Sequence, residues 1–183
     1  MLESKRIYLR NVSENDAPIL LKWGKDQSYH DSAGFGSYEN LAEAKKVAKQ
    51  YTMRKNSYLI CLKENDQVVG LIELNERGMD ERSWLLKTKE LGFLMDKDYR
   101  QKGLMTEAIN LVVKDAFINL DQNEIWAGTF ENNLKSQNLL KKLGFKYIYE
   151  IDYSQISDLF SYKEKYYLLK KTEWLKIEQN TKS

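Results

Sequence analysis

Segments with two different apolar periods alternate along almost the whole chain. Strand-like apolar runs are found at 7–12, 57–62, 67–74, 84–95, 124–130, 146–153 and 159–169. Apolar residues recur every three or four positions at 38–55 and at 103–120, which predicts two longer amphipathic helices. Shorter helices are expected near 13–24, which Ser13 would cap, and at 133–143, which Gly144 would end. This alternation predicts a mixed α/β fold.

Linker signals are missing between these segments. The chain has 183 residues, one proline and nine glycines, and it contains no repeat and no Gly-, Pro- or Ser-rich stretch. We therefore expect one continuous domain, 1–183, with a core at about 5–171 and a C-terminal tail at 172–183 that holds a short helix. The segment 27–37 includes Gly34 and Gly36 among polar residues, and we expect an irregular loop there.

The charge balance and the scarcity of Cys and His exclude several classes of function. Lys and Arg total 29 against 27 Asp and Glu, so direct nucleic-acid binding is not expected. With Cys61 and His30 as the only residues of their kinds, neither a disulfide nor a metal site is expected. Charges near the N-terminus and the lack of a long apolar run predict a cytoplasmic protein without a membrane span.

A strand, a basic loop and a helix follow one another at 91–108. Arg100 and Lys102 stand in the loop, and Gly103 precedes the helix. Unpaired N–H groups at a helix N-terminus, together with such cations, form a site suited to phosphate. Taken alone, the same pattern also fits a plain strand-to-helix turn with solvated charges.

A second motif lies about 30 residues further on, at 132–145, with Asn133, Ser136 and the ending Leu143-Gly144-Phe145. The two motifs together resemble the GNAT superfamily of N-acetyltransferases over about residues 5–170. The resemblance is strongest to the ribosomal-protein-alanine (RimJ/RimL-like) branch. It implies the GNAT fold, a mixed sheet of six to seven strands flanked by about four helices.

The resemblance also implies acetyl-CoA as the cosubstrate and assigns residues to it. The strand end at Phe93, Leu94 and Met95 would pair with the pantetheine arm, and its backbone would polarise the thioester carbonyl. The pyrophosphate would be surrounded by Arg100, Gln101, Lys102, Gly103, Leu104, Met105 and Thr106. Asn133 and Ser136 belong to the second cofactor motif. Met105 departs from the family pattern, which has Gly or Ala there.

Acid–base groups are less well defined. The family's usual general acid is a Tyr, but Leu140 stands at the matching position, so the resemblance points to Ser136 as the acid. Glu90 and Glu73 are the candidates for the base, with exposed strand-edge charge as the other interpretation of each.

The implied reaction is acetyl transfer to a primary amine, with a protein N-terminal α-amine as the first choice. A polyamine is the alternative acceptor, for which Asp26, Asp31, Glu39 and Glu43 would supply an acidic pocket. A non-catalytic acyl-CoA sensor is the alternative from a different class, because the usual Tyr is absent. A homodimer is also possible.

Overall fold

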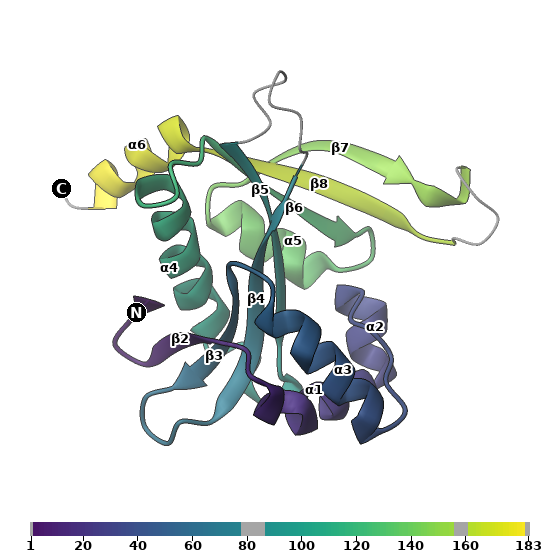
Figure 1. Ribbon diagram of the computed structural model, residues 1–183. Coiled ribbons are helices and arrows are strands. Elements are labelled where there is room, and N and C mark those ends of the chain that lie inside the picture. The colour runs from purple at the N-terminus through teal and green to yellow at the C-terminus, as the bar shows by residue number, and fades with distance from the viewer. Residues whose placement is uncertain (1, 78–86, 156–160, 182–183) are drawn as a thin grey trace. The chain divides into compact units, whose positions relative to one another are not determined.

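The computed structural model describes residues 2–77, 87–155 and 161–181 (Figure 1). The chain divides into two compact units: Met1–Leu74 with Gly92–Val112, and Asn75–Leu91 with Val113–Ser183. Strand β4 (Val68–Glu76), strand β5 (Thr88–Met95) and helix α4 (Leu104–Ile118) each run from one unit into the other.

The first unit is an antiparallel sheet with helices beside it. Its strands follow the order β1 (Leu2–Glu3), β2 (Ile7–Asn11), β3 (Ser57–Leu62) and β4 (Val68–Glu76). Its helices before α4 are α1 (Ala17–Gly24), α2 (Gln27–Ala33) and α3 (Leu41–Thr52), with short 3₁₀ turns η1 (Glu14–Asp16) and η3 (Lys97–Tyr99). Leu59 of β3 pairs with Leu71 of β4, and both are buried.

The helices α1, α2 and α3 share one hydrophobic core with β3 and β4, and Figure 1 shows them grouped together. Trp23 of α1 and Tyr29 of α2 are both buried there, with ring centroids 6.5 Å apart. Ala44 and Ala48 of α3 are fully buried. The two alanines lie one helical turn apart and share the face of α3 that packs into this core, as the helical spacing of its apolar residues predicts.

The prediction of an irregular loop at 27–37 is wrong, because residues Gln27–Ala33 form α2. The Asp26 side chain accepts a hydrogen bond from the Ser28 backbone N–H and caps the helix at its start. Gly34 ends it with a φ of 61°. An N-cap Asp followed eight residues later by Gly is a helix signal in the sequence that the polar composition obscured.

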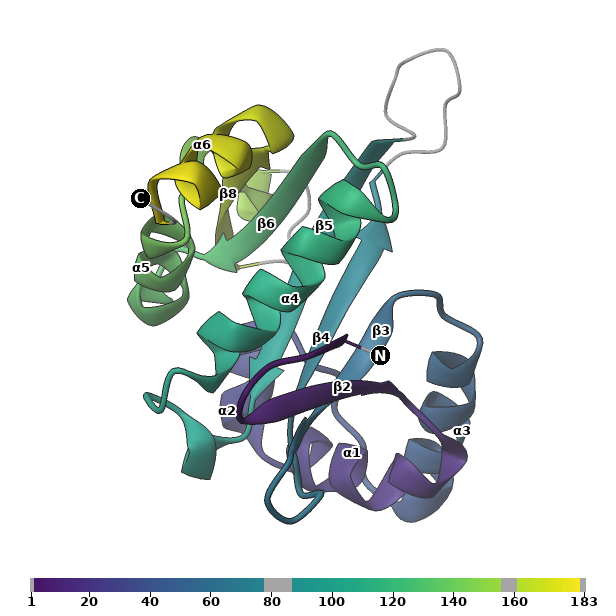
Figure 2. The same ribbon diagram turned by 90° about the vertical axis from the view of Figure 1, so that its left-hand side faces the viewer.

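The second unit joins β5 and β6 (Glu124–Phe130) in parallel and adds β8 (Lys163–Lys170) and β7 (Lys146–Asp152), both antiparallel to their neighbours. Burial alternates residue by residue along β6, as expected of a strand whose two faces differ. Helices α5 (Leu134–Lys142) and α6 (Lys171–Thr181) belong to this unit (Figure 2), as does the turn η4 (Tyr153–Gln155).

The C-terminal segment is a structural part of the second unit rather than a tail outside the core. Trp174 of α6 is buried, and its ring centroid lies 5.4 Å from that of Phe117. Ile177 lies against Gly144, where an added Cβ would overlap it.

The α/β fold class is confirmed, with more elements than expected. The described residues hold eight strands, in the order β1-β2-β3-β4-β5-β6-β8-β7, and six α-helices. The expectation was six to seven strands and about four helices. Strand β1 has two residues, too few to show a period, and α2 lies where a loop was expected. Helix α6 coincides with the short helix expected within 172–183. No described helix is long and apolar enough to cross a membrane.

Candidate active site

The end of β5 carries the first group of predicted cofactor residues, in the first unit. Leu94 and Met95 are buried, and Phe93 is half-buried. The next residue, Asp96, donates its backbone N–H to the carbonyl of Val69 in β4 over 2.9 Å. This bond fixes the point at which the chain leaves the sheet and enters the loop.

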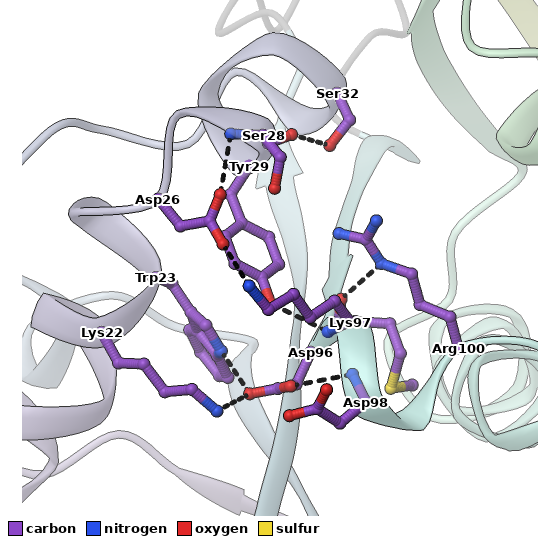
Figure 3. Close-up of polar contacts among 11 residues, drawn as sticks. Lys22, Trp23, Asp26, Ser28, Tyr29, Ser32, Asp96, Lys97, Asp98 and Arg100 are labelled. Atoms are coloured by element: carbon purple, nitrogen blue, oxygen red, sulfur yellow. Dashed lines mark hydrogen bonds and ion pairs between the residues drawn. The ribbon is translucent and has the colours of Figure 1, made fainter.

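Asp96 holds the start of that loop to α1 (Figure 3). Its buried Oδ2 accepts hydrogen bonds from Lys22 Nζ at 2.7 Å and from Trp23 Nε1 at 3.0 Å. Its Oδ1 accepts the backbone N–H of Asp98 at 3.2 Å. Burial works to raise the pKa of Asp96, but these hydrogen bonds outweigh it, so the pKa lies below its ordinary value.

Tyr29 of α2 supports the next part of the loop. Its hydroxyl accepts the backbone N–H of Lys97 at 2.8 Å, and Lys97 Nζ pairs with Asp26 at 2.9 Å. The Arg100 guanidinium lies 5.1 Å from the Tyr29 ring centroid, and Arg100 Nε donates to the carbonyl of Met95 at 3.1 Å (Figure 3). Arg100 is therefore held over the strand end rather than extended freely into solvent.

The loop itself turns through two left-handed residues, Gln101 at a φ of 61° and Gly103 at 78°. Gln101, Lys102 and Gly103 are exposed, and α4 begins directly after them at Leu104. The N–H groups in the first turn of a helix have no intrahelical acceptor, and they lie at the positive end of its dipole. An exposed turn of this kind, beside Arg100 and Lys102, fits a pyrophosphate group.

Leu104 and Met105 are buried at the start of α4, and Thr106 is half-buried. The Met105 side chain is only 8% exposed, so it packs into the interior of the protein. The departure from Gly or Ala at this position therefore adds no exposed side chain to the loop.

Arg6, which the sequence did not point to, ties the loop to the N-terminal strands. Its Nη1 donates to the Lys102 carbonyl at 2.9 Å, and its Nε donates to Glu107 Oε1 at 2.6 Å. Glu107 also accepts the Ser4 hydroxyl at 2.6 Å. Burial works to raise the pKa of Glu107, and the hydrogen bonds from Ser4 and Arg6 lower it below its ordinary value.

The second motif lies in the second unit. The Asn133 side chain accepts the backbone N–H of Ser136 at 3.1 Å and is the N-cap of α5. Ser136 is half-buried in the first turn of the helix. Leu140 is fully buried, so the position of the family's Tyr is filled by a core residue.

The two candidate bases are both engaged with arginines. In the first unit Glu73 Oε1 accepts from Arg54 Nη1 at 3.0 Å and from Ser57 Oγ at 3.1 Å. In the second unit Glu90 Oε2 accepts from Arg77 Nη1 at 2.9 Å. Each of the two candidate bases therefore has an arginine as its ion-pair partner.

The structure thus brings the predicted residues of 93–106 together in one unit, and Asn133, Ser136 and Glu90 belong to the other. The supporting residues Lys22, Trp23, Tyr29 and Arg6 were not found from the sequence. Only the helix signal at Asp26 and Gly34 would have drawn attention to Tyr29. Within the described ranges, no group of three or more His, Cys, Asp or Glu side chains is arranged to hold a metal ion.

Comparisons with known proteins identify the family and the fold of the chain. The family model of the acetyltransferase (GNAT) domain matches residues 6–146. The probable N-acetyltransferase YjcK of Bacillus subtilis (strain 168) is 30% identical over 156 residues, covering 79% of this chain and 83% of YjcK.

Two solved structures share the fold at low identity. The spermidine N-acetyltransferase of Vibrio cholerae in complex with CoA and spermine has a TM-score of 0.75 and 16% identity, over 94% of this chain and 99% of that chain. RimL, a ribosomal L7/L12 α-N-protein acetyltransferase, has a TM-score of 0.73 and 15% identity, over 91% of each chain. Because a family model matches well over half of its length, the chain belongs to the GNAT acetyltransferases and is an acyltransferase enzyme.

Proposed function

We propose that this enzyme transfers the acetyl group of acetyl-CoA to a primary amine, and that the loop 100–106 binds the cofactor's pyrophosphate. The observation that carries this proposal is the exposed left-handed turn at Gln101–Gly103 directly before α4, with Arg100 held beside it. The backbone of Phe93, Leu94 and Met95 would pair with the pantetheine arm. Asn133 and Ser136 would contribute from the second motif.

For the acceptor, we propose a protein N-terminal α-amine, as in the RimJ/RimL-like branch that the sequence motifs resemble. The fold similarity to the L7/L12 acetyltransferase is compatible with this acceptor. A polyamine is the second candidate, because the spermidine N-acetyltransferase has the same fold and a similar TM-score. An α-amine has an ordinary pKa of about 7.7–8.0 and needs little help to lose its proton at neutral pH, whereas a polyamine needs a base.

Ser136 is proposed as the general acid that protonates the departing thiolate, because Leu140 has no titratable group. Replacement of Ser136 by Ala should lower kcat and leave the affinity for acetyl-CoA nearly unchanged. An S136A variant with wild-type kcat would remove this role.

The experiment that tests the proposed function is acetyl transfer from labelled acetyl-CoA to a panel of amines. The panel holds an alanine-initiated peptide with its lysines blocked, the same peptide with a blocked N-terminus, spermidine and free lysine. Label in the first peptide alone would support the α-amine, and label in spermidine alone would favour the polyamine. Cofactor binding with no transfer to any amine would contradict the proposal.

A further inference from the structure

An aromatic platform lies on one face of the second unit's sheet, built by Trp126 of β6, Tyr149 of β7 and Tyr166 of β8. The ring centroids of Trp126 and Tyr149 are 5.8 Å apart, and the Tyr149 and Tyr166 rings stack at 5.0 Å with 24° between their planes. The neighbouring residue Tyr167 contacts Gln137 of α5, so the platform lies on the sheet face away from that helix.

The platform already binds one organic cation, the side chain of Arg77. Its guanidinium carbon lies 4.3 Å from the Trp126 ring centroid and 5.2 Å from that of Tyr166. Its two terminal nitrogens donate to Glu90 at 2.9 Å and to the Tyr149 hydroxyl at 2.7 Å. These contacts show that the ring faces and the carboxylate together suit a flat or compact cation.

A second carboxylate, Glu164 of β8, lies over the same face. It is half-buried, and its Oε2 accepts the Tyr166 hydroxyl at 2.8 Å. Gly128 of β6 makes room for it, since a Cβ at that position would overlap the Glu164 carboxyl group. The Tyr153 hydroxyl lies 2.9 Å from that of Tyr166 and extends the hydroxyl chain.

Glu164 differs from Glu73 and Glu90 in its partners. In the part of the second unit that the structure describes, Glu164 forms no ion pair with a Lys or Arg. Burial raises the pKa of Glu164 and the charge of Glu90 adds to this, while the tyrosine hydrogen bonds and Arg77 oppose it without reversing it. The site thus has two carboxylates and one guanidinium, and a half-buried carboxylate favours a further cation.

We propose that Glu164 binds the acceptor amine in its ammonium form and accepts one proton from it. A primary ammonium has three donors, which suits the Glu164 carboxylate and the oxygens of the Tyr153 and Tyr166 hydroxyls. One N–H bond breaks, one O–H bond forms on Glu164, and the electron pair remains on the nitrogen, which becomes a neutral nucleophile. Glu164 then releases the proton to solvent.

This inference rests on the proposed function and identifies its base. Glu73 and Glu90 are held by Arg54 and Arg77, so each would have to leave its guanidinium before it took up a proton. Among the described residues, the side-chain donors to Glu164 are tyrosine hydroxyls, which the substrate can replace without breaking an ion pair, and this suits Glu164 better to the role.

Calorimetric titration with spermidine and with n-butylamine, without acetyl-CoA, tests the binding step. Glu164→Gln should weaken the binding of both amines at least tenfold. Glu150→Gln is the matched control, because Glu150 is an exposed carboxylate of the neighbouring strand β7 that lies 3.8 Å from Lys165. It should change the binding less than twofold. Gly128→Ala displaces the Glu164 carboxyl group without removing it, and should weaken the binding as well.

The proton-transfer step has its own readout, the pH profile of kcat/KM for the amine. The wild-type value should fall as the pH is lowered through the pKa of Glu164. The groups that face Glu164 are Tyr153, Tyr166, Glu90 and Arg77. The variant should lose the limb, raise the amine KM and leave the acetyl-CoA KM within twofold.

Several results would overturn the inference. One is a Glu164→Gln variant whose amine affinity and pH profile equal those of the wild type. Another is a Glu150→Gln variant that loses as much amine affinity as Glu164→Gln. The third is a wild-type protein that binds neither amine. Failure of the proposed function would look different: the protein would not bind acetyl-CoA or would acetylate no amine, while its affinity for amines could still be compared among the variants.

Discussion

At the scale of single residues, Asp96 illustrates how the cofactor loop is held. Asp96 is only 1% exposed. Its carboxylate accepts hydrogen bonds from three donors, one of which is the charged Lys22. An Asn at this position would keep some hydrogen bonds but leave the Lys22 ammonium without its anion. We expect Asp96→Asn to lower the free energy of unfolding by about 1–3 kcal/mol at pH 7.

The pH dependence of that loss follows from the direction of the pKa shift. The pKa of Asp96 is lower in the folded protein than in the unfolded chain. The ionised carboxylate therefore stabilises the fold at any pH above the pKa of the unfolded chain. This stabilisation is lost as the pH falls through the pKa of the folded protein. The difference between Asp96→Asn and wild type in urea unfolding should be constant near neutral pH and shrink below about pH 4. Asp98→Asn, at an exposed position of the same loop, is the control and should change the free energy of unfolding at pH 7 much less than Asp96→Asn does.

Gly103 is the residue whose backbone most restricts the loop. Its φ of 78° is unfavourable for any side chain by roughly 1–2 kcal/mol. Gly103→Ala should therefore shift the loop and raise the KM for acetyl-CoA about tenfold, while kcat changes little. Gly34→Ala introduces similar backbone strain at the end of α2, where φ is 61°, and should lower stability without this rise in KM.

At the scale of elements, the side chain of Asn133 at the N-terminus of α5 is assigned two roles, helix capping and cofactor binding. Asn133 caps the helix with its side-chain oxygen, and the sequence resemblance assigns it to the cofactor. Asp is an equally good N-cap but has no amide donor. Asn133→Asp should keep the melting temperature and raise the acetyl-CoA KM, whereas Asn133→Ala should also cost about 1 kcal/mol of stability. An unchanged KM in Asn133→Asp would restrict this residue to capping.

The packing of the last helix, α6, depends on one buried aromatic side chain. Trp174 is 7% exposed and lies against Phe117. Trp174→Ala should lower the free energy of unfolding by about 3–5 kcal/mol, measured by denaturant unfolding, because it leaves a cavity beside Phe117. Leu175→Ala on the same helix, where Leu175 is 41% exposed, is the control and should cost far less.

How far the sequence predicts the elements depends on how strongly each one shows a period. The strand β6 and the helix α4 were predicted almost to their ends, because apolar residues recur along them at clear intervals. Helix α2 was missed since only Tyr29 among its seven residues is buried. Strand β1 has too few residues to show any period.

The site residues that could be predicted are likewise those that form a local pattern in the sequence. The loop 100–106 was found because the basic residues, Gly103 and the helix after it are contiguous in the sequence. Trp23, Tyr29 and Arg6 contact that loop from distant positions, and contacts between residues 68 to 96 apart leave no mark on a local pattern. Glu164 was missed for a similar reason, because the glycine that makes room for it lies in another strand.

At the scale of the whole molecule, the central claim is that the loop 100–106 binds acetyl-CoA. A ligand that binds only the folded state raises its stability by about 2.7 kcal/mol when it is present at 100 times its Kd. In a protein of 183 residues, this corresponds to a rise in melting temperature of several degrees.

The most direct test is thermal unfolding of the wild-type protein and of Gly103→Ala with acetyl-CoA, with ATP and NAD as control nucleotides. The expected result is a rise of several degrees for the wild-type protein with acetyl-CoA alone, and a much smaller rise for Gly103→Ala at the same concentration. Equal stabilisation of both proteins, or none of the wild type, would contradict the assignment of the loop 100–106 to acetyl-CoA.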